Sequence, residues 1–273
     1  MKIAYFGYNT FSSCLDLLIS SGHEILCIYT GKNSMFTDRV NNIAKQQNIP
    51  VSFEKPDKFE MDKLVKMGVE LFIAAEYPWK IPIPDALKYA VNVHPTMLPE
   101  GRGLTPLPWL LLAYPEHAGI TLHKMTNRFD QGDILLQKKI LLDDLESYDT
   151  LTAKLYIETP ILLNELLTKL DHYCQHASKQ DAGTHWEKIS RTAQTIDWHQ
   201  STSTVLKQIR AFGSLGVYAQ LAAHNYLITA AEGVEYQHQF NAGDLILIDQ
   251  IRLVIATKDG VISMPRNGLL VVD

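Results

Sequence analysis

Short apolar segments alternate with helix-like segments over the first third of the chain. The apolar segments are Met1–Gly7, His23–Thr30, Ile49–Phe53, Val69–Tyr77 and Ala90–His94. The helix-like stretches between them are Phe11–Ser21, Phe36–Asn48 and Met61–Gly68. Strands that alternate with helices are joined by crossover connections and lie parallel to one another. The pattern therefore predicts an α/β fold built on a parallel sheet.

The character of the sequence changes after a long helix-like stretch that ends near Tyr173. The next segment, Gln175–His185, is polar and typical of a linker. Beyond it come one helix-like stretch and several short strand-like runs with turns between them. We predict a Rossmann-like parallel-sheet domain over residues 1–180 and a smaller, mostly-β domain over residues 185–273. No G-x-G-x-x-G follows the first strand, so the dinucleotide-binding fingerprint is absent.

Charge and composition exclude several classes of protein. The net charge of −5 creates no overall field that would attract a polyanion. The three cysteines are odd in number and widely spaced, which fits a reduced compartment without a disulfide framework. No apolar run approaches the roughly 20 residues of a membrane span, and the first residues enter a strand without a signal-peptide pattern. We expect a cytoplasmic protein with no membrane partner.

Asn92 and His94 lie two residues apart at the end of a strand-like run. This spacing puts both side chains on the same face of an extended chain, and open parallel sheets bind ligands beyond the carboxyl ends of their strands. The amide can donate to a developing oxyanion, and the imidazole can exchange a proton near neutral pH. A histidine that only caps the strand is the alternative.

The stretch "HPTMLPEGRG" after this pair favours the functional interpretation. Pro95 and Pro99 restrict its backbone, while Gly101 and Gly103 permit tight geometry. A rigid loop beside a polar pair suits a preorganised site.

Asp130 is a third candidate, in the turn "RFDQGDI" between two predicted strands. Gly132 permits an unusual backbone conformation in this turn. Aspartate is common in turns for structural reasons, so Asp130 alone would indicate nothing more.

Together these motifs resemble the folate-dependent formyltransferases. The resemblance rests on Asn-x-His, Leu98-Pro99, Arg102-Gly103, Pro106, "GITLHKM" and D-x-G-D-I. It covers most of the chain up to about Tyr173, and "IDWHQSTSTVLKQIRAFGSLGVYA" is similar to the start of the C-terminal domain shared by the tRNA and sugar enzymes. The pattern is most similar to sugar-nucleotide N-formyltransferases, and less similar to methionyl-tRNA formyltransferase and glycinamide ribonucleotide transformylase. Thr96 replaces a serine that many relatives carry but keeps the hydroxyl.

The resemblance implies that a primary amine attacks the formyl carbon of 10-formyl-tetrahydrofolate, with no metal. Asn92, together with protonated His94, would stabilise the tetrahedral oxyanion. His94 would also move the proton of the attacking amine, and Asp130 would orient the imidazole and favour its charged form. A non-catalytic folate- or nucleotide-binding module is the contrasting hypothesis, but such a module needs no set of all three side chains.

The resemblance also places folate against "EYPWKIP" and the "RFDQGD" loop. The residues assigned to cofactor binding are Tyr77, Trp79, Ile81, Gly132 and Asp133. A buried anchor explains Trp79 equally well.

The expected acceptor is a small-molecule, nucleotide-linked amino sugar and not a nucleic acid. The segment His185–Asp273 carries 7 Lys and Arg residues against 8 Asp and Glu residues, so it has no positive surplus for a phosphate backbone. The loop Thr30–Val40 is short and only mildly basic, whereas the tRNA enzyme has a basic insertion there. Arg102 is the candidate for a diphosphate because its guanidinium matches phosphate geometry. An arginine that stabilises its loop by bonding to carbonyls is the alternative.

Tyr8, Asn9 and Thr96 complete the predicted acceptor site with Arg102, and Tyr77 is a further candidate for contact with the hexose. The alternative acceptors are initiator methionyl-tRNA and a hydroxyornithine-type siderophore precursor. No metal site is predicted, because the helical pair His172 and His176 supplies only two ligands. A homodimer is left open.

Overall fold

The structure, a computed structural model, divides into two compact units. The first contains Met1–Pro106, His117–Leu141 and Thr152–Trp186, and the second contains Leu107–Glu116, Leu142–Leu151 and Glu187–Asp273. The structure describes residues 1–32, 34–221 and 224–272. Asn33 of the loop predicted to be mildly basic, and residues 222–223 and 273 of the predicted second domain, lie outside the described residues.

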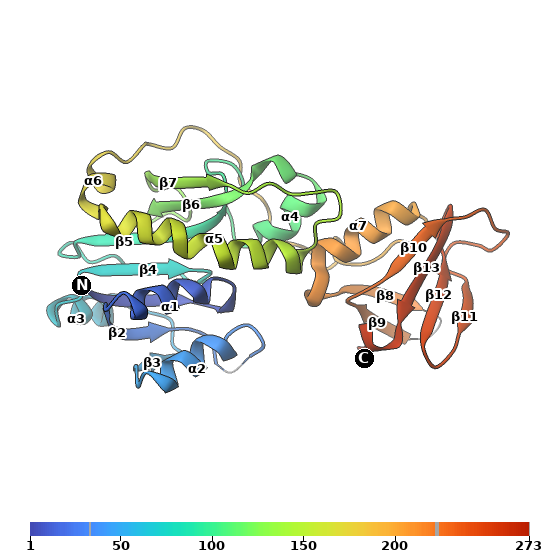
Figure 1. Cartoon of the computed structure of the whole chain (residues 1–273), viewed down its shortest axis with the longest axis horizontal. Helices are drawn as coiled ribbons and strands as arrows, with labels where there is room; N and C mark the ends of the chain where they lie inside the picture. The colour runs from blue at the N-terminus through green and yellow to red at the C-terminus, as the bar shows by residue number, and fades with distance from the viewer. Residues whose placement is uncertain (33, 222–223, 273) are drawn as a thin grey trace. The chain divides into compact units, whose positions relative to one another are not determined.

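The first unit is built on a seven-stranded sheet with the order β3-β2-β1-β4-β5-β6-β7 (Figure 1). Its strands are β1 Lys2–Gly7, β2 Glu24–Tyr29, β3 Val51–Ser52, β4 Leu71–Ala75, β5 Tyr89–Thr96, β6 Ala118–Lys124 and β7 Ile134–Lys139. Neighbouring strands run parallel to one another from β3 through β2, β1 and β4 to β5. Strand β6 runs antiparallel to β5, and β7 runs antiparallel to β6. The connection from β6 to β7 contains no helix, so β7 has to return antiparallel. The predicted Rossmann-like fold class is confirmed, and the sheet is mixed at one edge.

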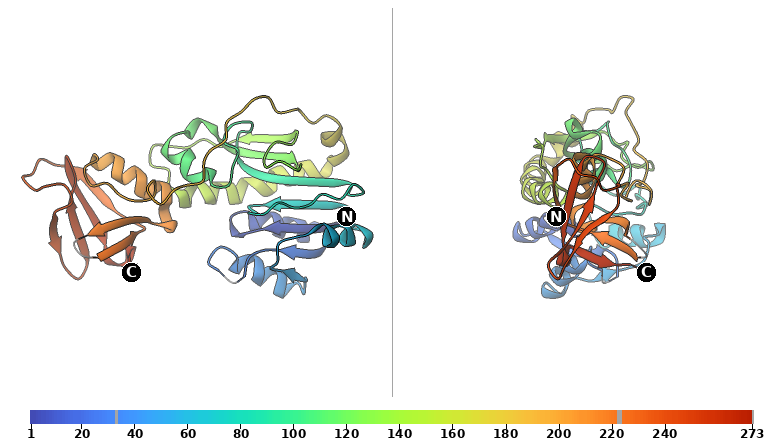
Figure 2. Two further views of the ribbon diagram at one scale, coloured as in Figure 1. Left: turned by 180° about the vertical axis from the view of Figure 1, so that it is seen from behind. Right: turned by 90° about the vertical axis from the view of Figure 1, so that its right-hand side faces the viewer.

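Helices cover the two faces of this sheet (Figures 1 and 2). They are α1 Ser12–Ser20, preceded by the 3-10 turn η1 Asn9–Phe11, then α2 Asp38–Gln46, α3 Lys58–Lys66, α5 Tyr148–Thr168 and α6 Leu170–Gln175. The carboxylate of Asp57 caps α3 by accepting from the Glu60 N–H, which has no partner within the helix. The single long helix predicted to end near Tyr173 is therefore two helices, α5 and α6.

Alternating side chains of β1 supply both layers of the core. Phe6 points to the α3 face, where its ring stacks on Tyr29 at 4.8 Å and meets Phe72 at 5.3 Å and Tyr77 at 5.6 Å between centroids. Tyr5 points to the opposite face, and its hydroxyl donates to the Phe11 carbonyl just before α1. The end of β1 is therefore fixed from both sides of the sheet.

In an open α/β sheet with this strand order, a crevice is expected at the carboxyl ends of β1 and β4. The chain leaves β1 for β2 on one side, while β4 lies on the other, so the direction of the strand order reverses here. Open α/β sheets bind ligands at such a switch point. The segments that follow β1, β4 and β5 are the ones that border it.

The second unit is mostly β, as predicted for the C-terminal region. Helix α7, Thr202–Phe212, begins after Ser201, whose hydroxyl caps it by accepting from the Thr204 N–H. A four-stranded sheet has the order β10-β13-β12-β11, and a three-stranded sheet has the order β14-β9-β8. Their strands are β8 Val217–Leu221, β9 His224–Ile228, β10 Glu232–Glu235, β11 Leu245–Ile248, β12 Arg252–Ala256, β13 Gly260–Pro265 and β14 Leu269–Val271. Among the described residues of the whole chain, no helix has the length and apolar character needed to cross a membrane.

We predict that Phe6→Ala lowers the free energy of unfolding by about 3–5 kcal/mol, because it leaves a cavity among three aromatic rings. Phe59→Ala is the matched control, since the Phe59 side chain is 78% exposed; it should change stability by less than about 0.5 kcal/mol. Denaturant unfolding followed by circular dichroism measures both. Equal losses in the two variants would contradict the assignment of Phe6 to the core.

Candidate active site

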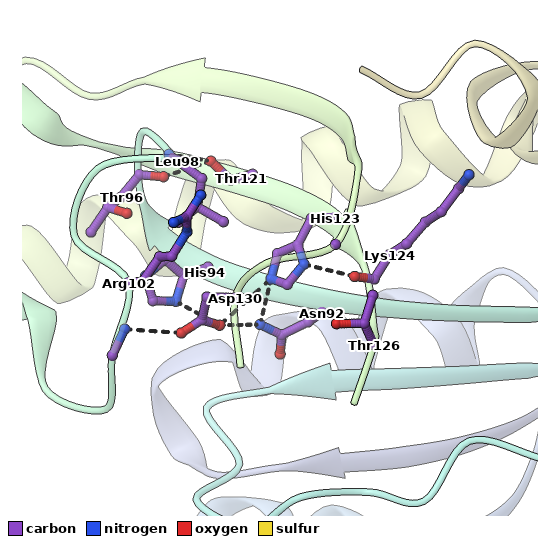
Figure 3. A network of polar contacts seen from close by, with 12 residues as sticks. Asn92, His94, Thr96, Leu98, Arg102, Thr121, His123, Lys124, Thr126 and Asp130 are labelled. Carbon is purple, nitrogen blue, oxygen red and sulfur yellow. Dashed lines mark hydrogen bonds and ion pairs between the residues drawn. The ribbon is translucent and has the colours of Figure 1, made fainter. Parts of the chain in front are cut away.

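Asn92, His94 and Asp130 come together at the carboxyl end of β5 (Figure 3). Asp130 lies in the loop between β6 and β7. Its Oδ1 is 3.5 Å from Nδ1 of His94 and 3.3 Å from Nδ2 of Asn92. The side chains of Asn92 and His94, which share a face of β5, thus both approach the Asp130 carboxylate.

Hydrogen bonding determines which nitrogen of His94 exchanges a proton. Nε2 lies 2.8 Å from the carbonyl of Gly101, so Nε2 carries a hydrogen and donates it. In the neutral ring the lone pair is then on Nδ1, which faces Asp130. Burial lowers the pKa of His94, although the charge of Asp130 acts in the opposite direction. The resting imidazole is therefore neutral at neutral pH, and Nδ1 is the atom that takes up a proton.

Asp130 is a buried carboxylate in a left-handed backbone conformation, with φ of 53°. Its Oδ2 accepts from the Gly103 N–H at 3.0 Å. Burial alone would raise the pKa of Asp130, but the neighbouring His94, His123 and the Gly103 N–H outweigh burial and hold that pKa well below its usual range. Asp130 is therefore ionised at neutral pH.

His123, on β6, belongs to the same network and was not among the predicted site residues. Its Nδ1 donates to the Lys124 carbonyl at 2.9 Å, which leaves the lone pair on Nε2. Nε2 accepts from Asn92 Nδ2 at 2.9 Å and lies 3.6 Å from Oδ1 of Asp130. The sequence carried a signal for it, because His123 is the histidine of "GITLHKM". Its position opposite Asn92 follows from the antiparallel pairing of β5 with β6.

The amide of Asn92 has a fixed orientation. Its Nδ2 donates to both His123 and Asp130, and Oδ1 points away from them (Figure 3). The reverse orientation would set Oδ1 against a carboxylate and a lone pair. The resting site therefore presents a hydrogen-bond acceptor at Asn92, where the sequence led us to expect a donor. Donation to an oxyanion requires Nδ2 to release one of its two partners.

The loop after His94 is closely packed. The hydroxyl of Thr96 donates to the Glu100 carbonyl at 2.6 Å, and Thr96 is fully buried. A Cβ on Gly103 would lie 2.6 Å from the Trp186 carbonyl. The side-chain hydrogen bond of Thr96 therefore stays within this stretch of chain, and Thr96 supports the site from a fully buried position.

Arg102 and Gln180 join this loop to the segment predicted to be a linker. Arg102 donates to Oε1 of Gln180 from Nε at 3.1 Å and from Nη2 at 2.8 Å, and also to the Asp181 carbonyl. Nε2 of Gln180 donates to the carbonyls of Asp130 at 2.9 Å and Gly132 at 2.7 Å. The linker interpretation is wrong for this part of the chain, because its polar groups satisfy loop carbonyls of the first unit. Arg102 has the contacts of the loop-stabilising alternative.

The segment after β4 lines the predicted folate side. Tyr77 and Ile81 pack against the core cluster under α3, and the ring of Trp79 meets Tyr77 edge-on at 5.4 Å. The Tyr77 hydroxyl is buried and has no hydrogen-bond partner among the described residues. Lys80 Nζ lies 5.7 Å from the centroid of the Phe129 ring and so bridges the two loops predicted to hold folate. Trp79 is half-buried, and both interpretations of it stay open.

Gly132 and Asp133 occupy a tight turn before β7. A Cβ on Gly132 would lie 1.7 Å from the Lys124 carbonyl, so any side chain there would displace the turn. Asp133 Oδ2 is 3.4 Å from Lys124 Nζ. The Lys124 carbonyl is thus enough to explain why this turn has a glycine at position 132.

The predicted acceptor residues after β1 lie at the crevice but are partly engaged. The Asn9 amide donates to Asp38 and to the Met35 carbonyl, and its oxygen accepts from the Val40 N–H. Tyr8 is half-buried, and burial raises the pKa of its hydroxyl. The structure therefore assigns Asn9 a structural part in fastening this loop to α2.

Within the described residues, no group of three or more His, Cys, Asp or Glu side chains is arranged to hold a metal. The rings of His172 and His176 lie 4.3 Å apart, but Nδ1 of His176 donates to the His172 carbonyl. This pair has the contacts of a helix end.

Comparison with known proteins agrees with this fold. The family model described as formyl transferase matches residues 1–167, and the model of the formyl transferase C-terminal domain matches residues 188–266. A methionyl-tRNA formyltransferase of Coxiella burnetii is 28% identical over 98% of this chain and 91% of its own length. The chain therefore belongs to the formyl transferase family.

Two solved structures share the fold. HypX from Aquifex aeolicus, in complex with tetrahydrofolic acid, superposes with a TM-score of 0.72 at 19% identity over 97% of this chain. This chain corresponds to 43% of the length of that protein. An N-formyltransferase from Helicobacter canadensis, in complex with folinic acid and dTDP-3-aminofucose, has a TM-score of 0.66 at 16% identity and covers 97% of this chain and 99% of its own.

We predict that Gln180→Ala loosens the Asp130 loop. The variant should therefore lose turnover in formyl transfer as well as lower the melting temperature. Gln180→Glu keeps an oxygen for Arg102 but loses the two donors to the loop carbonyls, so it should resemble Gln180→Ala. Gln131→Ala, at an exposed position of the same loop, is the control. Turnover and melting temperature are the measurements. A fully active Gln180→Glu would show that the carbonyl bonds do not hold the site.

Proposed function

We propose that this chain is an N-formyltransferase that moves a formyl group from 10-formyl-tetrahydrofolate to the amine of a nucleotide-linked amino deoxy sugar. The observation that carries the proposal is the pairing of a neutral His94, open at Nδ1, with an ionised Asp130 at the end of β5. A proton acceptor of this kind suits an attacking amine, which must lose a proton as it forms its new bond.

The residues on the folate side fit a flat, partly apolar ring system with a polar edge. Ile81 and the half-buried Trp79 are apolar, and the buried Tyr77 hydroxyl has no hydrogen-bond partner among the residues that the structure describes. Gly132 and Asp133 would supply backbone groups from the opposite loop. When bound, the folate would supply the activated formyl carbon. The chain itself would hold the ring between the segment after β4 and the turn before β7.

Each residue of the network then has a distinct part in the transfer. Oδ1 of Asn92 accepts a hydrogen bond from the approaching amine and so orients its lone pair. Nδ1 of His94 takes the proton that the amine releases, and Asp130 stabilises the imidazolium that results. His94 would return this proton to the folate nitrogen as its bond to the formyl carbon breaks, so that the leaving group departs as a neutral amine and the imidazole is again neutral. Charge on the formyl oxygen can be met by Nδ2 of Asn92 once it releases one of its partners, at a site where such donors are worth about 3–4 kcal/mol.

The balance of charge supports a nucleotide-linked sugar as the acceptor. The region His185–Asp273 has no positive surplus, and the Helicobacter canadensis structure was solved with dTDP-3-aminofucose. Arg102 remains the candidate for the diphosphate, and Tyr8 from the loop after β1 remains a candidate for contact with the hexose. Binding a phosphate at Arg102 requires its guanidinium to share or release Gln180.

Initiator methionyl-tRNA is the second candidate acceptor. It is favoured by relatives such as the methionyl-tRNA formyltransferase of Coxiella burnetii, which this chain matches over 91% of that protein's length. The experiment that decides is a panel of amino sugar nucleotides and charged initiator tRNA, assayed with 10-formyl-tetrahydrofolate. We expect turnover with a sugar nucleotide and inhibition by free dTDP or UDP. Turnover with tRNA alone, with affinity lost about 10³-fold or more between about 50 and about 200 mM salt, would reject the sugar.

We predict that His94→Ala and Asn92→Ala leave a folded protein with turnover reduced about 10²–10³-fold or more, the usual effect of removing one group that acts in the transition state. Binding of 5-formyl-tetrahydrofolate, measured by calorimetry, should persist in both variants. Near-normal turnover in either variant would remove that residue from the mechanism.

The pH dependence gives a separate prediction. Because burial lowers the pKa of His94 below its ordinary 6.5, the acid limb of kcat/KM should lie below that value. Asp130→Asn removes the charge that opposes burial, so the His94 pKa should fall further and the limb should move to lower pH. The plateau should also fall, because the imidazolium loses its partner. Asp85→Asn, at an exposed position, is the control. A limb that moves to higher pH in Asp130→Asn would contradict the proposed pairing.

A further inference from the structure

A pocket of about 510 Å³ lies between α2 and β3, at the edge of the sheet in the first unit. Figure 1 shows these two elements side by side. The volume is typical of pockets that hold a small molecule, about 300–1,000 Å³. None of the residues that line the pocket belongs to the catalytic network. They are Lys32, Asn41, Lys45, Ile49, Val51 and Phe53.

The pocket has an apolar floor and a polar wall. Ile49, Val51 and Phe53 occupy every second position of the stretch that contains β3, so their side chains share one face. The Phe53 side chain is 38% exposed, so part of its ring is open to a ligand. Asn41 and Lys45 lie one turn apart on α2 and form the facing wall. The pocket thus offers a surface for a flat ring, with hydrogen-bond donors at the edge of that ring.

The side chains of the pocket carry positive charge and no negative charge. Lys32 and Lys45 are cations, and none of the other four lining residues is ionisable. Lys32 Nζ lies 3.8 Å from Oε1 of Glu54, but these two side chains are 78% and 79% exposed. Such an exposed ion pair contributes little to stability, so an anionic group can take the place of Glu54. The charge of the pocket therefore complements a ligand that combines a flat ring with phosphate groups.

Gly31 joins the pocket to the loop that is predicted to meet the acceptor. Nδ2 of Asn41 donates to the Gly31 carbonyl at 3.5 Å. A Cβ on Gly31 would lie 3.1 Å from the Tyr8 hydroxyl, so this hydroxyl lies close against Gly31. A single residue thus separates the pocket from Tyr8, and a ligand that leaves the pocket past Gly31 meets Tyr8 next.

The distance from the pocket to the catalytic strand suits an extended nucleotide sugar. Continuing the pairing of β2, β1, β4 and β5 by one or two residues gives a row along the carboxyl edge of the sheet: Gly31, Tyr8, Glu76 and His94. Three strand spacings separate the ends of this row, which is about 14 Å. A nucleoside diphosphate joins its base to its sugar over a comparable length. With its amine at His94, such an acceptor extends its base beyond Gly31 and into the pocket.

We propose that this pocket binds the base of the acceptor nucleotide and that Lys32 meets its diphosphate. The proposal rests on the proposed function, because it takes a nucleotide-linked sugar as the acceptor. The Phe53 ring stacks on the base, and Asn41 and Lys45 donate to oxygens at the edge of the base. Uracil and thymine each carry two carbonyl oxygens and adenine carries none, so these donors favour a uridine or thymidine nucleotide.

This assignment moves the diphosphate away from Arg102. Arg102 holds Gln180, which donates to carbonyls of the loop between β6 and β7. In the order of the sheet, that loop lies on the other side of β5 from β2 and β3. An extended acceptor with its amine at His94 and its base in the pocket therefore does not reach Arg102. The two positions for the diphosphate exclude each other, and Arg102 is the one that already has a partner.

Binding of free nucleotides tests the pocket without turnover. Phe53→Ala should lower the affinity for UDP or dTDP about tenfold or more, the usual effect of removing an aromatic ring that stacks on a base. Phe59→Ala, at the exposed Phe59, is the matched control and should bind like the unmutated protein. Both variants should bind 5-formyl-tetrahydrofolate normally in calorimetry. Equal affinity for UDP and dTDP in the two variants, or no binding of either nucleotide to the unmutated protein, would overturn the proposal.

A second pair of variants tests the contacts at the edge of the base. The unmutated protein should bind UDP more tightly than ADP, and Lys45→Ala should reduce this preference. Lys66→Ala, at an exposed position of α3, should leave the preference unchanged. Equal affinity of the unmutated protein for UDP and ADP, or a preference that Lys45→Ala does not alter, would overturn the assignment of these donors to the base.

Methyl NMR gives the position of the bound nucleotide. Addition of UDP should shift the methyl signals of Ile49, because Ile49 lies on the floor of the pocket. The methyl signals of Ile81, which follows β4 on the predicted folate side, should stay in place. A shift at Ile81 without one at Ile49 would put the nucleotide outside the pocket and overturn the proposal.

Kinetic measurements separate failure of the pocket from failure of the proposed function. With an amino sugar nucleotide, Phe53→Ala should raise the acceptor KM and leave kcat unchanged, because the base is bound equally in the ground state and the transition state. The matching amino sugar 1-phosphate has no base, so Phe53→Ala should use it as well as the unmutated protein does.

Two outcomes of these measurements are distinct. Formyl transfer to a sugar nucleotide with the same KM in Phe53→Ala and Phe59→Ala would overturn the pocket and leave the proposed function standing. UDP binding that depends on Phe53, without turnover of any sugar nucleotide, would reject the proposed acceptor and leave the pocket as a nucleotide site.

Discussion

The buried carboxylate of Asp130 is the interaction on which the site depends. A charge removed from water requires donors, and those of Asp130 come from separate segments of the chain. The Gly103 N–H comes from the loop after β5 and the Asn92 amide from β5 itself, and His123 of β6 holds that amide in place by accepting its other hydrogen. Its own main-chain carbonyl accepts from Gln180, far along the sequence. Satisfying this one carboxylate therefore fixes β5, β6 and two loops relative to one another, including His94.

The same network separates the charge states of two adjacent groups. Asp130 receives enough hydrogen bonds to stay ionised, while His94, buried and already donating from Nε2 to Gly101, stays neutral. A neutral base next to a fixed negative charge is poised to accept one proton, because the charge it acquires already has a partner. The arrangement needs no change of conformation for that step. Preorganisation of this kind is the usual source of a large rate effect in enzymes.

The sequence predicted what depends on local periodicity and spacing, and missed what depends on register and long-range contacts. Alternating segments indicated the parallel part of the sheet, and the spacing of Asn92 and His94 placed them on one face. His123 could have been found in its motif, but its place in the site follows from the pairing of β5 with β6. Gln180 carries no such signal, because a polar residue in a polar stretch looks like a linker. The left-handed backbone conformation of Glu76 likewise could not be predicted from the residues "AAEYP".

The proposed mechanism does not depend on which amine is formylated, so the choice of acceptor must come from other parts of the chain. Nothing in Asn92, His94 or Asp130 distinguishes a sugar amine from an aminoacyl one, since all three are proposed to act on the nitrogen and the formyl group. The first unit contributes Arg102, whose guanidinium already holds Gln180. Gln180 in turn holds the carbonyls of the Asp130 loop. A phosphate that competes with Gln180 for Arg102 would weaken the contact that helps to hold the Asp130 loop. A phosphate that leaves the contact between Arg102 and Gln180 intact would not. The acceptor is therefore best identified by experiments that change Arg102 and Gln180 separately, because their shared contact lies between phosphate recognition and catalysis.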